Sequence, residues 1–131
     1  MEEVKNEVPA EPTSINAKGF KLKYKAFSNP QGFIEAMRKV SLCTAYPTLK
    51  QKYRIKRLTD TLEQELKNFF EIQKDFNKLE GDEFKSKMDE LLDMSVDVKW
   101  SRLSKEELEC IPNLSPADLY ALEFVADVEG L

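Results

Sequence analysis

The 131-residue sequence contains no histidine, which removes the commonest general base and the commonest metal ligand of proteins. It also lacks a glycine-rich phosphate loop, a G-x-S-x-G nucleophile motif and a C-x-x-C pair. The carboxylates are numerous, but they are spread along the polar faces of expected helices. We therefore predict that the protein is not an enzyme and holds neither a cofactor nor a metal.

Cysteine is also scarce, since Cys43 and Cys110 are the only two, and their spacing matches no metal or redox motif. We expect two free thiols in a reducing compartment, because a disulfide would require Cα atoms within about 7 Å of each other. No apolar run approaches the roughly 20 residues of a membrane span, and the acidic start resembles no signal peptide. These absences predict a soluble protein that is not secreted by a signal peptide.

Length and composition fit one domain with one hydrophobic core. Residues 1–17 contain four glutamates, two prolines and few apolar residues, which is typical of an extended acidic arm. We expect an N-terminal arm over residues 1–17 and a single, mainly helical domain over residues 18–131.

One long helix, predicted over residues 48–79, organises this domain. It opens with Thr48 and Gln51, which can form a capping box, and no glycine or proline follows before Gly81. Apolar residues then recur every three or four positions and form one continuous stripe. The stripe comprises Ile55, Leu58, Leu62, Leu66, Phe69, Ile72, Phe76 and Leu79.

Shorter helices are expected on both sides of the long one. Asn29 and Pro30 start the first, and Ser104 and Ser115 start two near the C-terminus. After a break at Gly81, Asp82 is the expected cap of a helix that reaches about Met94 and folds back as an antiparallel hairpin. Its inward positions are Phe84, Met88, Leu91 and Leu92.

Two stretches alternate apolar and polar residues, as half-buried strands do. They are residues 19–27 and residues 96–100, and we expect them to pair with Asp97 opposite a lysine and Trp100 in the core. The predicted fold class is therefore α+β, mainly α, with a long amphipathic helical hairpin and a small two-stranded antiparallel sheet.

Charge is strongly segregated along the chain. Residues 18–57 contain eleven basic residues and one acid, whereas residues 58–131 contain eight basic and nineteen acidic residues. The two halves could neutralise each other within one molecule, bind head to tail between copies, or leave the basic half to bind nucleic acid. The residues predicted to bind a partner are Lys21, Lys23, Lys25, Lys50, Lys52, Arg54, Lys56 and Arg57.

Two segments of the long helix carry a resemblance to a known group. They read Lys-Tyr-Arg-Ile-Lys-Arg-Leu over residues 52–58 and Leu-Glu-Gln-Glu-Leu over residues 62–66. With the later Ser-x-x-Asp-Leu-x-x-Leu pattern of residues 115–122, this resembles small proteins of tailed bacteriophages and prophages, over about residues 20–126. The resemblance implies a phage-encoded virion or assembly component, in the virion or the host cytoplasm, and it transfers no functional residue.

These observations predict a non-catalytic structural or assembly protein that acts through protein–protein contacts. It would be a multicopy component of a phage capsid, neck or tail, and its partners would be other proteins or copies of itself. The alternative is a small adaptor or regulator that binds a protein or nucleic acid through the basic Lys18–Arg57 face. Neither hypothesis involves a membrane or a small-molecule substrate.

Overall fold

The computed structural model describes residues 19–128, so the predicted arm over residues 1–17 lies outside the described part. Its elements confirm the predicted α+β, mainly α class. In chain order they are β1 (Phe20–Lys23), the 3-10 helix η1 (Tyr24–Phe27), α1 (Pro30–Leu42), α2 (Leu49–Lys74), α3 (Gly81–Leu92), β2 (Ser95–Val98), α4 (Lys105–Glu109) and α5 (Pro116–Ala121).

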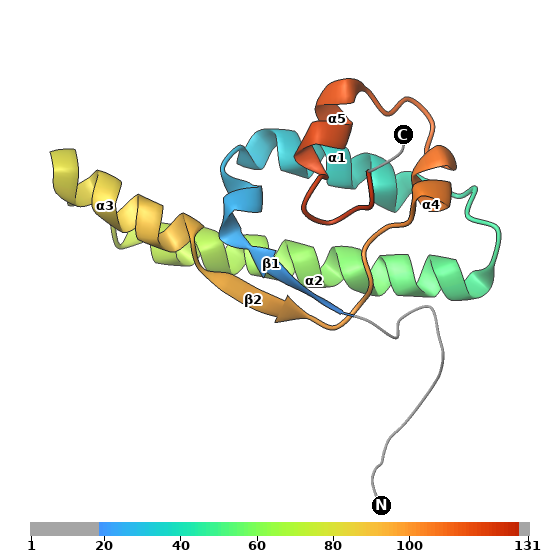
Figure 1. The fold of residues 1–131 in the computed structure, drawn as a ribbon, viewed down its shortest axis with the longest axis horizontal. Coiled ribbons are helices and arrows are strands. Elements are labelled where there is room, and N and C mark those ends of the chain that lie inside the picture. The colour runs from blue at the N-terminus through green and yellow to red at the C-terminus, as the bar shows by residue number, and fades with distance from the viewer. Residues whose placement is uncertain (1–18, 129–131) are drawn as a thin grey trace, which may run out of the picture.

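Helix α2 is the axis of an elongated molecule (Figure 1). Helix α1 packs along one side of it, and α5 packs on α1. The two-stranded sheet lies across another side of α2, and α3 extends at the end opposite the start of α2 (Figure 1). Among the helices of the described residues, none combines the length and apolar character that crossing a membrane requires.

The predicted start of α2 is confirmed, whereas its predicted end is wrong. The Thr48 hydroxyl accepts from the Gln51 amide at 3.1 Å, and the Gln51 side chain accepts from the Thr48 amide at 3.2 Å. The regular helix ends at Lys74, and the chain continues to Leu79 in turns closed by bonds three residues apart. Such turns are tighter than those of an α-helix, so Phe76 and Leu79, the last residues of the apolar stripe, do not continue its α-helical spacing.

Helix α3 turns back toward the end of α2 and packs on η1, which is consistent with the expected hairpin. The Gln73 amide contacts the Met88 sulfur at 3.9 Å, and Leu91 is buried. Two details are corrected: Glu80, not Asp82, is the cap, and Phe84 is exposed rather than inward. Gly81 has φ of +61°, which glycine adopts readily, so the turn and the helix start coincide there.

The sheet is antiparallel and pairs Lys21 with Asp97, as predicted, with 2.9 Å between Nζ and Oδ1. The first strand is shorter than expected because η1 replaces its second half. The three-residue turn of η1 directs both Tyr24 and Phe27 onto Phe69 of α2, with ring centroids 5.7 and 5.6 Å away. A continued strand would have placed these two rings on opposite faces.

The C-terminal helices have the predicted capping boxes, at Ser104 and Ser115. Lys39 of α1 donates to Asp118 of α5 at 2.5 Å, and this bond holds the pKa of the Asp118 carboxyl below its usual value. The segment after α5 then returns to form a parallel bridge between Leu103 and Ala126. This return closes one end of the core.

The cysteines are free thiols, as expected from the sequence. Cys43 follows α1, and its thiol donates to the carbonyl oxygen of Cys110 at 3.3 Å. The two residues therefore join the ends of α1 and α4 without a covalent bond.

The buried tyrosines predict a loss of stability at alkaline pH. Burial, reinforced by a 2.9 Å hydrogen bond to Glu65, raises the pKa of Tyr24 to about 12, and burial also raises the pKa of Tyr46. An unfolded tyrosine ionises near pH 10. The stabilisation of the fold by the neutral, buried tyrosines is therefore complete below about pH 10 and disappears as pH rises through about 12. Urea melts from about pH 8 to about pH 12, followed by circular dichroism, should show this loss. Tyr24→Phe should lose less stability over that range, whereas Tyr53→Phe, at an exposed position, should match the wild type. If the free energy of unfolding fell equally with pH in all three proteins, buried Tyr24 would not be the cause of the loss.

Candidate functional site

The eight residues predicted to bind a partner do not form one uniform surface. Lys21 and Lys23 project from β1, and each faces a carboxylate: Asp97 at 2.9 Å and Asp93 at 3.6 Å. Lys25 lies in η1 and is exposed. Exposed ion pairs contribute little to stability, but they reduce the positive charge that these lysines offer to a partner.

Arg54 does not belong to the exposed surface, which corrects the prediction from sequence. Its side chain is only 4% exposed and donates to Glu107 of α4, which is itself buried. It also donates to the carbonyl oxygens of Ser101 and Arg102 at 2.9 and 3.3 Å. Arg54 therefore fixes α2 to the 101–107 segment. Its place four residues before Leu58 of the apolar stripe was the sequence signal for burial.

The remaining predicted residues of α2 define the basic end, which comprises Lys50, Lys52, Lys56 and Arg57. All four are exposed, and Lys56 forms an ion pair with Asp60 at 3.0 Å. Within residues 19–128, the other three have no carboxylate at ion-pair distance. Cations in the first turns of a helix are unfavourable because they face the positive end of its dipole. The basic end is thus a surface where an acidic partner would add stability.

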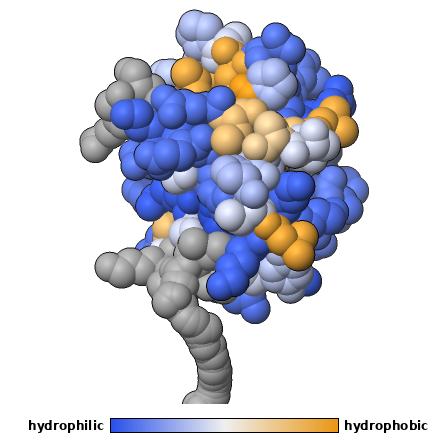
Figure 2. Space-filling view, turned by 90° about the vertical axis from the view of Figure 1, so that its right-hand side faces the viewer, coloured by the Kyte–Doolittle hydropathy of each residue, from blue (hydrophilic) through white to orange (hydrophobic). Residues whose placement is uncertain are grey.

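Figure 2 views the molecule from the end where α2 begins. Hydrophilic residues cover most of this face, and hydrophobic residues lie among them in several places (Figure 2). Leu42 and Leu49 are both highly exposed, at 72% and 81%, on either side of the connection between α1 and α2. Exposed Glu106 and Glu109 of α4 add negative charge to the same part of the fold. Contacts here would therefore be mainly polar, with a few apolar side chains included.

Beside the basic end lies a group that the sequence analysis missed, the tryptophan cluster, formed by Tyr53, Arg57, Lys99 and Trp100. The Tyr53 ring meets the Trp100 ring edge-on, with centroids 6.2 Å apart. The guanidinium carbon of Arg57 and Nζ of Lys99 lie 5.7 and 5.9 Å from the Trp100 centroid. The four-residue spacing of Tyr53 and Arg57 places both on one face of α2, which was the available sequence signal.

Trp100 is buried, as predicted, but the prediction of a simple core residue is incomplete. Its indole Nε1 is buried and has no hydrogen-bond partner among the described residues. Next to the cluster, Arg102 covers the ring of Phe20, with 4.4 Å from its guanidinium carbon to the ring centroid. Buried polar groups of native proteins are nearly always satisfied, so the unpaired N–H requires an explanation.

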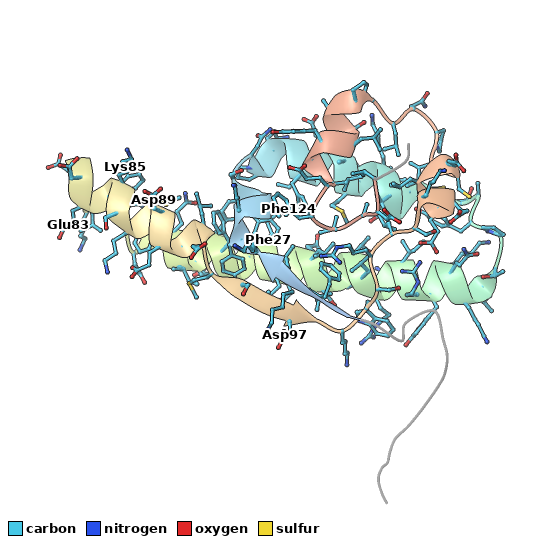
Figure 3. All side chains as sticks on the ribbon, viewed as in Figure 1. Phe27, Glu83, Lys85, Asp89, Asp97 and Phe124 are labelled. Carbon is cyan, nitrogen blue, oxygen red and sulfur yellow. The ribbon has the colours of Figure 1, made fainter. Side chains whose placement is uncertain are left out.

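The acidic charge gathers at the other end of the molecule, on α3. Between Gly81 and Asp93 the chain has five acids and two lysines. Figure 3 shows Glu83 near the outer end of α3, opposite the start of α2. Only Leu91 of this helix is fully buried, so most of its surface is available to another molecule.

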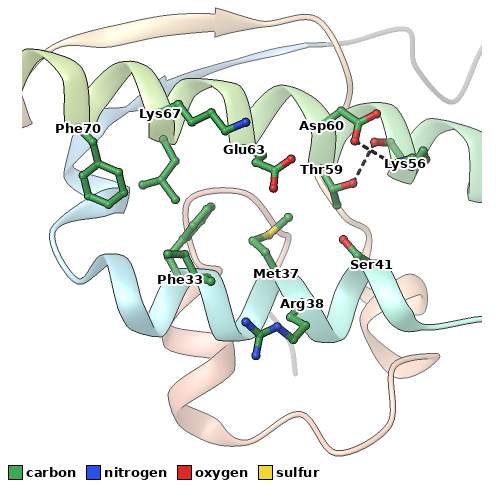
Figure 4. Close-up of a pocket in the computed structure, with 12 residues that line it drawn as sticks. Phe33, Met37, Arg38, Ser41, Lys56, Thr59, Asp60, Glu63, Lys67 and Phe70 are labelled. Carbon is green, nitrogen blue, oxygen red and sulfur yellow. Dashed lines mark hydrogen bonds and ion pairs between the residues drawn. The ribbon is translucent and has the colours of Figure 1, made fainter.

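A groove of about 530 Å³ lies between α1 and α2 (Figure 4). Apolar side chains of both helices form part of it, including Phe33, Met37 and Phe70. Its charged lining residues are Arg38, Lys56, Asp60, Glu63 and Lys67. The mixture of signs gives the groove no strong preference for a charged ligand.

Within residues 19–128 there is no group of three Cys, Asp or Glu side chains placed to hold a metal ion. Comparisons of the chain with models of protein families, with curated proteins and with solved structures give no match. The resemblance to small phage proteins therefore stays a prediction.

Proposed function

We propose that this is a non-catalytic assembly protein that works by binding other proteins, with further copies of itself as partners. The observation that carries the proposal is the placement of the basic end and the acidic α3 at opposite ends of one elongated molecule (Figure 1). Complementary surfaces at opposite ends favour head-to-tail contacts, which build rings or open stacks.

The unpaired charges of the two ends support this contact. Lys50 and Lys52 lie in the unfavourable first turns of α2, and acids from the α3 of a neighbouring copy would neutralise them. Charge pairs at such an interface determine partner choice and orientation more than affinity. The resemblance to tailed-phage proteins suggests the setting, a multicopy component of a capsid, neck or tail.

Reversing the charge of either end should abolish self-association. We expect the wild type to form larger species at low salt that dissociate at high salt, because salt screens exposed charges beyond about 8–10 Å. Lys50→Glu with Lys52→Glu should stay monomeric, and so should Asp82→Lys with Glu83→Lys. A mixture of the two variants should associate again, because the reversed ends are complementary. Light scattering coupled to size exclusion measures each mass.

The matched control reverses two exposed cations away from both ends, Arg38→Glu with Lys67→Glu. This variant has the same change in net charge as the basic-end variant, and it should associate like the wild type. A wild-type protein that is a strict monomer at every salt and protein concentration would rule out self-assembly.

Nucleic-acid binding through the basic face is the second candidate. The specific observation in its favour is the tryptophan cluster, because aromatic rings beside cations are typical of surfaces that stack bases and bind phosphates. The net charge of −4 weighs against it. A filter-binding titration with DNA and RNA tests this function, and binding that survives Lys52→Glu with Arg57→Glu would exclude the basic face as its site.

A further inference from the structure

We propose that the acidic N-terminal residues 1–17 bind across the tryptophan cluster of the same chain. This inference goes beyond self-assembly, although Arg57 belongs to both the basic end and the cluster. It rests on the charge of the cluster, on the place where the described chain begins, and on the unpaired indole N–H.

The cluster lacks an anionic partner. Arg57 and Lys99 both lie near the Trp100 ring, and neither has a carboxylate at ion-pair distance within residues 19–128. Neighbouring Arg102 donates to the carbonyl oxygen of Phe124 at 3.2 Å. This oxygen is uncharged, so the positive charge of Arg102 has no carboxylate partner within residues 19–128. Three cations thus surround two aromatic rings, a surface suited to a carboxylate-rich peptide.

The chain enters the described fold beside this surface. A Cβ placed on Gly19 would lie 2.1 Å from the carbonyl oxygen of Val98 and 2.8 Å from Cα of Lys99. Only glycine allows so close an approach, so Gly19 holds the chain against the backbone that leads into Trp100. At no more than about 3.3–3.6 Å per residue, seventeen residues can span roughly 55–60 Å, so the whole cluster is within reach.

The composition of residues 1–17 matches what the cluster lacks. The segment has Glu2, Glu3, Glu7 and Glu11 against a single Lys5, a net charge of −3. Its carboxylates can pair with the three cations, and its prolines and valines can pack on the Trp100 and Tyr53 rings. A carboxylate or backbone carbonyl of the segment can accept the indole N–H that has no partner among the described residues.

Attachment to the same chain makes this segment the favoured occupant. Covalent attachment through a short tether gives a local concentration on the order of millimolar, which a separate copy or a separate acidic protein must exceed to compete. Docking would therefore cover the cluster in the isolated protein.

Trp100 is the only tryptophan in the sequence, so its fluorescence reports on the cluster directly. Deleting residues 1–17 should shift the emission to longer wavelength and increase quenching by iodide at constant ionic strength. Adding a synthetic peptide of residues 1–17 to the shortened protein should reverse both changes. In the full chain, the quadruple variant Glu2→Gln, Glu3→Gln, Glu7→Gln and Glu11→Gln should behave like the deletion. Since it keeps every residue of the described fold, it tests the proposal even if the shortened protein folds poorly.

The matched control is a peptide in which all four glutamates are glutamine, and it should not reverse the changes. Emission and quenching that stay the same in both the deletion and the quadruple variant would overturn the proposal. So would a signal that depends on protein concentration in the Asp82→Lys with Glu83→Lys variant, whose acidic end is reversed, because that result would assign the cluster to a second copy. Reversal by the glutamine peptide as complete as by the native one would show that the carboxylates are not what the cluster recognises.

Discussion

Replacing Arg54 with methionine is expected to lower the free energy of unfolding by about 3–5 kcal/mol. The substitution keeps an extended side chain in the buried position but removes the only cation that pairs with Glu107 within the described residues. Glu107 is 2% exposed, so its charge would remain in the interior with only the bonds from Gln51 at 3.1 Å and the Ser104 amide at 2.9 Å. Urea unfolding near pH 7, followed by circular dichroism, measures the loss.

Lys56→Met is the matched control for this prediction. It removes a cation from the same helix, but the Lys56–Asp60 pair is exposed, so the expected change is below about 1 kcal/mol. A second comparison is Arg54→Met combined with Glu107→Leu, which should recover part of the lost stability because no unpaired charge remains. If Arg54→Met cost no more than Lys56→Met, Arg54 would not be the buried tie between α2 and α4.

Phe69→Ala is expected to destabilise the protein by about 3–5 kcal/mol, since it removes a fully buried ring. The ring is 1% exposed and lies 5.7, 5.6 and 5.8 Å from the ring centroids of Tyr24, Phe27 and Phe70. Its loss would leave a cavity where η1 meets α2, and three aromatic contacts would disappear together. Urea unfolding gives the change, and near-ultraviolet circular dichroism reports the altered ring packing.

Phe84→Ala is the control for the cavity. Phe84 lies on the outer part of α3 and is 37% exposed, so its removal should change stability by less than about 1 kcal/mol. Equal losses for the two substitutions would mean that the outer part of α3 contributes as much to the core as the centre of α2 does.

Much of the fold could be predicted because its signals are local. The capping box at Thr48 and the stripe through Ile55 and Leu66 depend on residues three or four apart, and α2 follows them. Sheet pairing was also predictable, because two alternating stretches have no other strand to pair with. The 3-10 helix η1 was not predicted, because residues 19–27 alternate apolar and polar side chains whether their second half continues the strand or forms a turn against α2.

The candidate site was less accessible to sequence analysis because its contacts are long-range. Charge segregation is visible in the sequence, but the placement of the two charges at opposite ends depends on how α3 folds back. The partners of Arg54 lie 47 to 53 residues away, so its spacing from Leu58 could indicate burial but could not identify Glu107 as its partner. The tryptophan cluster likewise combines Tyr53 of α2 with residues 99 and 100, which follow β2.

The bridge between Leu103 and Ala126 affects the order in which the protein can fold during synthesis. Leu103, Leu122 and Val125 are completely buried, and the Leu103 amide donates to the Val125 carbonyl oxygen at 3.0 Å. Chains are made from the N-terminus, so α1 and α2 emerge from the ribosome well before the segment that closes their core. Until residues 122–126 are available, the apolar faces of these helices stay open to water and to chaperones, and premature docking with another copy would compete with native closure.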